Sequence, residues 1–108
     1  MKVISEAALD RFRTSGPCEC CQKFCQRREP HHILSRGQEG QRRIDKEENL
    51  VALGGTFDCL CHRNATLNRD GFLREDMAEL AGRRLGKTGA ECIKEVERIR
   101  SLHPSEVG

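Results

Sequence analysis

Apolar residues recur along this chain at two spacings, and the spacing separates the expected helices from the expected strands. Near the N-terminus, Ser5 is a residue type that caps helices. Behind it, Ala8, Leu9 and Phe12 fall on one helical face. The sequence therefore predicts a short helix over residues 5–13, which the Ser-Gly-Pro run at 15–17 is expected to end.

Two short apolar segments are predicted to pair as a hairpin. The first covers residues 29–34 and is entered through a proline, and the second covers residues 49–53 and is followed by two glycines. A basic loop that contains glycines at positions 37 and 40 joins them. A helix over residues 58–70 is expected next, with Gly71 as its C-terminal stop. The order is strand, loop, strand and helix.

Two more helices are expected in the remaining sequence. The first covers residues 74–85, and its inner face carries Met77, Leu80 and Ala81. A capping box of Thr88 and Glu91 opens the second. The apolar residues of that last helix recur at helical spacing: Cys92, Val96, Ile99 and Leu102. Cys92 is expected to be a buried thiol and His103 a cation at the helix end.

The length of 108 residues predicts a single domain. Its expected parts are an N-terminal helix in residues 1–16, a core in residues 18–71 and C-terminal helices in residues 72–108. Aromatic residues make up only 4% of the chain, so little large apolar surface can be buried and a covalent or metal staple is expected.

Seven cysteines could supply that staple. The odd count, the adjacent pair Cys20 and Cys21, and a start without an apolar signal core all argue against a disulfide framework. Thiolates bound to zinc in a reducing cytoplasm fit better. No apolar run approaches the ~20 residues that span a bilayer, so no membrane partner is expected.

The spacing of the cysteines predicts a zinc site. Cys18 and Cys21 form a C-x2-C pair, which lets a tight turn aim two sulfurs at one tetrahedral ion. Cys59 and Cys61 are the available partner pair. Cys20 and Cys25 stay open as competing ligands, because their spacing also occurs at zinc sites.

Positive charge is concentrated around this region. Residues 22–46 carry seven basic side chains against three acidic ones, a surplus of four. A basic segment beside histidines suits a polyanionic partner, although a solvated, salt-bridged loop has the same composition. Arg36, Arg42 and Arg43 are the candidates for phosphate contacts.

Together these residues resemble the HNH endonucleases, a family with a ββα-metal core. The likeness covers residues 18 to about 68. It depends on these motifs, in order: Cys18-x2-Cys21, Pro30-His31-His32-Ile33, Glu48-Asn49-Leu50-Val51-Ala52-Leu53 and Cys61-His62. It implies an α+β fold with a small zinc-stapled ββα-metal core and flanking helices.

The resemblance also implies the roles of individual residues. His31 and His62 would hold a catalytic divalent ion, Mg²⁺ or another metal, and His32 would be the general base. Asn49 would orient that base and brace the hairpin, and structural Zn²⁺ would bind Cys18, Cys21, Cys59 and Cys61. The implied activity is hydrolysis of phosphodiester bonds in DNA. With so few aromatics for base stacking, duplex DNA contacted through its phosphate backbone is the expected substrate.

The chemistry of the residues agrees with that activity. Neutral imidazole can take a proton from water near working pH, and an ion held by two imidazoles keeps positions open for phosphate oxygens. Successive side chains of a strand point to opposite faces, so His31 and His32 need a bend, or one of them reaches the substrate from the far side.

Two departures from the family pattern bear on this interpretation. The second cysteine pair is C-x-C where the family commonly has C-x2-C, and the stretch from Leu53 to Cys61 is longer than usual, which would shift the start of the helix. Thr66 stands where some members have a further histidine, so water or phosphate would complete the shell of the ion. The alternative function is a non-catalytic zinc-ribbon module that binds nucleic acid, with His31 or His62 in place of a cysteine ligand. That module has no use for His32 or Asn49.

Overall fold

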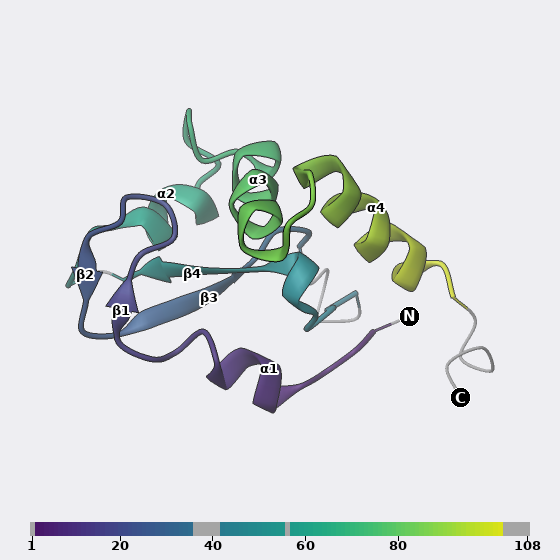
Figure 1. Ribbon diagram of the computed structural model, residues 1–108, viewed down its shortest axis with the longest axis horizontal. Coiled ribbons are helices and arrows are strands. Elements are labelled where there is room, and N and C mark those ends of the chain that lie inside the picture. Colours follow the sequence, from purple (N-terminus) through teal and green to yellow (C-terminus); the bar gives the residue numbers. More distant parts are fainter. Residues whose placement is uncertain (1, 36–41, 56, 103–108) are drawn as a thin grey trace.

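The computed structural model describes residues 2–35, 42–55 and 57–102, and they form a small mixed helix and sheet fold. Figure 1 shows two thin sheets with helices on either side of the longer one. The elements, in chain order, are α1 (Glu6–Asp10), β1 (Gly16–Pro17), β2 (Phe24–Cys25), β3 (Arg28–His32), the 3-10 helix η2 (Glu47–Asn49), β4 (Leu50–Gly54), α2 (Cys61–Thr66), α3 (Arg74–Leu85) and α4 (Gly89–Arg100).

The antiparallel pair of β3 and β4 is the centre of the fold. In its register His31 lies opposite Val51 and His32 opposite Leu50. Every residue of β4 is buried, because helices cover both of its faces. The predicted hairpin is therefore present, although Asn49 belongs to η2 and precedes the strand.

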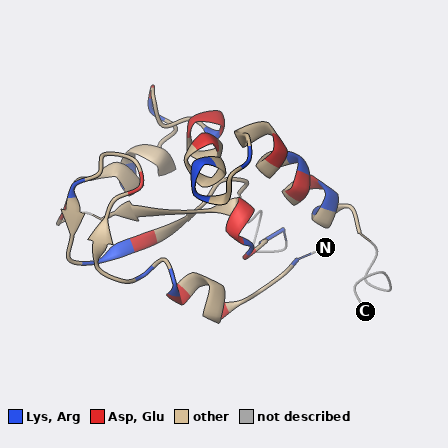
Figure 2. Ribbon diagram, in the orientation of Figure 1, with Lys and Arg blue, Asp and Glu red and all other residues tan. Residues whose placement is uncertain are grey.

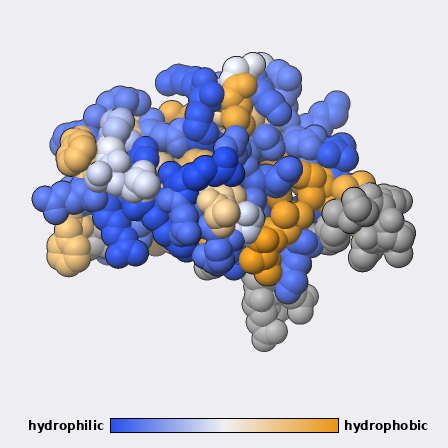
Figure 3. All heavy atoms as spheres, turned by 60° about the horizontal axis from the view of Figure 1, so that its bottom comes forward, coloured by the Kyte–Doolittle hydropathy of each residue, from blue (hydrophilic) through white to orange (hydrophobic). Residues whose placement is uncertain are grey.

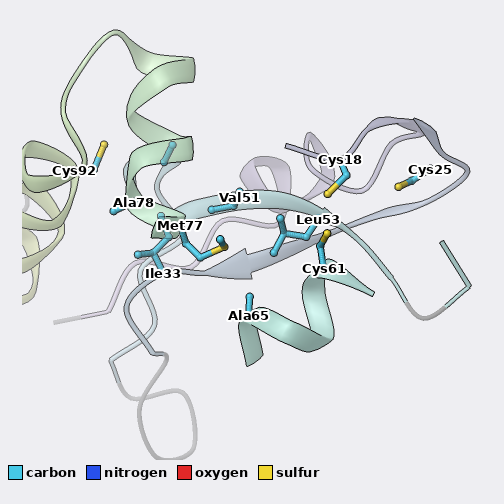
Figure 4. Packing of buried hydrophobic residues seen from close by; sticks show 11 residues of the cluster. Cys18, Cys25, Ile33, Val51, Leu53, Cys61, Ala65, Met77, Ala78 and Cys92 are labelled. Atoms are coloured by element: carbon cyan, nitrogen blue, oxygen red, sulfur yellow. The ribbon is translucent and has the colours of Figure 1, made fainter. Parts of the chain in front are cut away.

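Alternate residues of β4 enter different apolar clusters, as the two-residue repeat of a strand requires. Leu50 and Ala52 pack against the three apolar residues of the N-terminal segment, Ala8, Leu9 and Phe12. Val51 and Leu53 pack on the other side with Met77 of α3 and with the start of α2 (Figure 4). One five-residue strand thus joins the N-terminal and C-terminal helices.

Helices α3 and α4 have nearly the limits that the sequence predicts. Thr88 caps α4 and exchanges hydrogen bonds with Glu91, so the capping box is confirmed. Cys92 is fully buried, as expected. Val96 and Ile99 cover Leu34 and Ile44, the residues on either side of the hairpin loop. Acidic and basic residues are mixed along both helices (Figure 2), so neither presents a uniformly basic surface.

Two of the expected helices are shorter in the structure. Helix α1 ends at Asp10, and α2 covers Cys61–Thr66 where residues 58–70 were predicted. Leu60 and Asn68 adopt left-handed backbone conformations and so bound α2 on both sides. Gly71 therefore lies in the turn before α3 and is not the stop of α2. His103 lies outside the described residues.

Among the described residues, no helix is long and apolar enough to cross a membrane.

The buried side chain of Asn49 braces the hairpin from inside. Its Oδ1 accepts from Leu34 N at 2.7 Å, and its Nδ2 donates to Leu34 O at 3.3 Å and to Ile44 O at 3.0 Å. These bonds tie together the two ends of the loop between β3 and η2. No other residue type of this size offers both a donor and an acceptor in this arrangement.

We predict that Asn49→Ala lowers the free energy of unfolding by roughly 1–3 kcal/mol, because buried backbone groups lose their partners. Urea unfolding with zinc present measures the change. Asn64→Ala on α2 is the control and should shift stability by less than about 0.5 kcal/mol. Equal stabilities of the two variants would contradict the bracing role.

Candidate metal centre and histidine cluster

Four cysteines from two distant segments meet beside the end of β4. Cys18 and Cys21 lie in the connection between β1 and β2, and Cys59 and Cys61 lie at the start of α2. Their four sulfurs are all within 4.8 Å of one another and could hold a metal ion such as zinc. In Figure 4 the side chains of Cys18 and Cys61 lie close to each other across this junction. The predicted set of sulfurs is therefore brought together.

Gly54 makes room for this cluster. A Cβ atom at that position would lie 2.4 Å from the sulfur of Cys59 and 2.7 Å from that of Cys25. Both distances are shorter than real side-chain contacts, so a larger residue would push the sulfurs apart. The glycine that ends β4 is thus part of the cysteine site.

The electrostatics of the cluster favour a thiolate at Cys59. Burial acts to raise the pKa of Cys59, but the backbone N–H of Cys61 and neighbouring thiols donate to its sulfur and lower it to about 7. For Cys25, burial and the negative charge at Cys59 raise the pKa to about 11. Among the described residues, Cys25 is not part of the set of four sulfurs that lie within 4.8 Å of one another. Cys20 lies at the edge of the cluster, and its pKa is raised mainly by burial.

Two histidines lie next to each other near the start of α2. His31 of β3 and His62 of α2 have ring centroids 5.5 Å apart, in an edge-to-face arrangement. Burial, then the positive charge that His62 and His32 can carry, lowers the pKa of His31 to about 4. His31 is therefore neutral near pH 7, which is the form that binds metals.

Glu29 stands behind His62. Its Oε2 lies 3.6 Å from His62 Nδ1, which is a charge contact and too long for a hydrogen bond. A carboxylate on this side favours a proton on Nδ1 and leaves Nε2 of His62 for a ligand. Gly55 admits the carboxylate, since a Cβ there would lie 2.0 Å from Glu29 Oε1. No sequence pattern had marked Glu29 as a site residue.

His32 is bound to a buried carboxylate. Its Nε2 lies 2.8 Å from Asp45 Oδ1, and Asp45 is only 1% exposed. Arg43 and the backbone N–H of Ser5 also donate to this carboxylate. Burial acts to raise the pKa of Asp45, but its hydrogen bonds with Arg43, His32 and Ser5 lower it to about 2. Asp45 is thus ionised and accepts a hydrogen bond from the Nε2–H of His32, so Nδ1 carries the lone pair of that ring.

These contacts bear on two expectations. Asp45, and not Asn49, makes the contact with the ring of His32, while Asn49 binds the backbone of the hairpin. Arg43 was expected to contact phosphate, but its guanidinium is held by Asp45 and Glu6. From the sequence alone, Asp45 is one charge in a basic loop, because no local sequence pattern indicates that residue 45 folds back onto residue 32.

The three histidines line one open pocket of about 500 Å³ between β3, α1 and α2. Arg13 and Arg74 also line it, and neither was singled out from the sequence. Arg13 is paired with Glu6 and Asp10, whereas Arg74 is an exposed residue at the start of α3. Arg42 is exposed, and Arg36 lies outside the described residues.

Comparison of the chain with protein-family models, with curated proteins and with solved structures found no significant match.

We predict that complete removal of zinc unfolds the protein. Structural zinc contributes ~10–16 kcal/mol of apparent binding energy in small domains, as much as or more than the net stability of a typical domain. Loss of helical circular dichroism, together with elemental analysis for zinc, checks this. Full helical signal in zinc-free protein would contradict a structural role of the cluster.

Gly54→Ala gives the same test without a chelator. The added Cβ should displace the sulfurs, so the purified variant should carry less zinc than the wild type. Gly86→Ala is the matched control, because its positive φ strains the backbone while no atom lies within 4 Å of the new Cβ. It should lose some stability and keep its zinc.

We also predict that His31 contributes to the pH dependence of stability. Its pKa is lowered from 6.5 to about 4 in the folded protein, so between these values the unfolded chain binds more protons. The free energy of unfolding should therefore fall as the pH is lowered through this window.

Urea unfolding of wild type and His31→Asn across the same window isolates this contribution, since protonation of the cysteines affects both proteins alike. The variant should show the shallower slope. Identical slopes would mean that His31 is not neutral and buried in solution.

Proposed function

We propose that this protein is a metal-dependent endonuclease of the HNH type, which hydrolyses phosphodiester bonds in DNA. The observation that carries the proposal is the arrangement of three histidines on one pocket. His31 and His62 face each other, and His32 beside them is paired with the ionised carboxylate of Asp45. Two ligands and one oriented base are what hydrolysis of a phosphodiester requires.

In this proposal His31 and His62 hold a divalent ion. His31 lies on β3 of the hairpin and His62 on α2, the helix that follows the hairpin. This is the order that the family resemblance implies. The neutral form of His31, which burial favours, fits such an ion. When bound, the ion supplies positive charge for the phosphate oxygens and open positions for oxygen ligands.

His32 is proposed to take the proton from the attacking water. The Asp45 carboxylate accepts from Nε2, which fixes the tautomer, turns Nδ1 into the proton acceptor and stabilises the imidazolium that forms. Arg43 and the N–H of Ser5 keep that carboxylate ionised. Asp45 is thus a positioning residue, which acts through His32.

Phosphate contacts are proposed for two exposed arginines. Arg74 lines the pocket and is exposed, and Arg42 is exposed at the end of the loop before Ile44. A guanidinium can hold a phosphate through two parallel hydrogen bonds. The cysteine site supports the same proposal, because Cys61 precedes His62 directly and fixes the start of α2.

The test is an assay of purified, zinc-loaded protein on supercoiled plasmid with Mg²⁺, Mn²⁺, Ni²⁺ or no added ion. Wild type should nick the plasmid only with an added ion. His32→Ala should lower the rate by about 10²–10⁴-fold, the usual range for general base catalysis, while binding of the exchangeable ion survives. His62→Ala should weaken the binding of that ion, and cleavage should partly recover at high metal concentration.

Asp45→Asn tests the positioning role. The amide keeps the size of the side chain but has no negative charge to fix the tautomer of His32. The cleavage rate of this variant should therefore lie between those of wild type and His32→Ala. Its pH–rate profile should also shift. His103→Ala is the control for loss of a histidine and should cut at the wild-type rate. Zinc-dependent DNA binding without cleavage under any ion would instead favour the zinc-ribbon module.

A further inference from the structure

Two of the four phenylalanines are exposed at the same end of the molecule. Phe24 of β2 is 71% exposed, and Phe57, after β4, is fully exposed. Both line one surface hollow of about 760 Å³. Figure 3 shows apolar atoms amid hydrophilic surroundings at the end of the molecule that carries β2. The fold gains little from these rings, because they are not buried.

The rest of the hollow is polar. Gln26, Arg27, Glu29 and Asp58 line it along with the two rings. The carboxylate of Asp58 accepts from Gln26 N at 3.3 Å, which holds the loop after β4 against the turn after β2. The hollow carries two carboxylates and one cation, so the amino groups of a flat ring system stacked on the aromatic faces fit it better than a phosphate does.

The hollow adjoins the histidine pocket. Glu29 lines the hollow, and its carboxylate lies 3.6 Å from His62. Glu29 thus belongs to the hollow and contacts a proposed metal ligand, on the side of the His62 ring away from Nε2.

We propose that the hollow between Phe24 and Phe57 is a nucleobase subsite. This inference rests on the proposed function and adds a substrate class to it: DNA with an unpaired base next to the cleaved bond, as in bulges, gaps and flaps. An unpaired base stacks against both rings, and the carboxylates of Glu29 and Asp58 accept from its amino groups. Arg27 faces the adjoining phosphate.

This proposal revises the expectation of fully paired duplex as the substrate. That expectation came from the low aromatic content, and a count of residues says nothing about their exposure. Two rings in one hollow suffice for a single base. Fully paired DNA keeps its bases stacked inside the duplex and offers nothing to this surface.

The test measures binding without cleavage. Zinc-loaded protein, with no other divalent ion added, is mixed with a DNA duplex that carries one bulged 2-aminopurine, and with the same duplex fully paired. Stacking of the bulged base on an aromatic ring should change its fluorescence. The bulged duplex should bind more tightly, by roughly 5- to 150-fold, which is the range for stacking one base.

Phe24→Ala and Phe57→Ala should each remove most of this preference. Phe57→Leu keeps the apolar volume but has no aromatic ring, so it should also lose the fluorescence change. Leu67→Ala is the matched control, since Leu67 is 52% exposed but does not line the hollow. It should behave as wild type. All three side chains are exposed, so the four variants should fold.

Equal binding of the two duplexes by wild type would overturn the subsite, as would a preference that survives both phenylalanine substitutions. If those substitutions instead abolish self-association in sedimentation and leave DNA binding unchanged, the hollow is an interface between two copies. The plasmid assay is independent of these results. Cleavage without base preference overturns only the subsite, and base preference without cleavage overturns only the nuclease.

Discussion

The burial of β4 on both faces is the constraint on which the other features depend. Leu50 and Ala52 hold the N-terminal helix, Val51 and Leu53 hold α2 and α3, and the backbone pairs with β3. A strand fixed in this way permits one register only, because a slip by one residue would exchange the two apolar sets. The positions of His31 and His32 follow from that register, since each lies opposite a fully buried residue of β4.

The cysteine cluster and the histidine pair share one short helix. Cys61 begins α2 and His62 follows it directly, so the sulfur cluster positions the start of the helix that presents His62 to His31. With only six residues, α2 is too short to be stable by itself. Its place is set by Cys61 and Ala65, which are buried against the core. The adjacent Cys61 and His62 thus link the stability of the fold to the geometry of the proposed site.

The sequence predicted the elements that local patterns define and missed the contacts that the fold creates. Capping of α4 by Thr88, the burial of Cys92 and the proximity of the four cysteines all follow from spacing and residue type. The predicted limits of α2 were wrong, because Leu60 adopts a left-handed backbone conformation, which leucine rarely adopts. The sequence did not indicate Asp45, Glu29 and Arg74 as site residues. Each reaches its histidine or the pocket from a distant part of the sequence, and helical or strand periodicity does not show such contacts. The exposure of Phe57 was equally invisible in a count of aromatics.

The hydrogen bond from Ser5 N to Asp45 connects the beginning of the chain with the proposed base. Ser5 also caps α1 through its hydroxyl, so one residue joins the docking of the N-terminal segment to the charge that orients His32. Ser5 and Asp45 are 40 residues apart in the sequence, so this contact exists only when the N-terminal segment is docked. Undocking of that segment would remove one of the donors that hold the carboxylate beside His32.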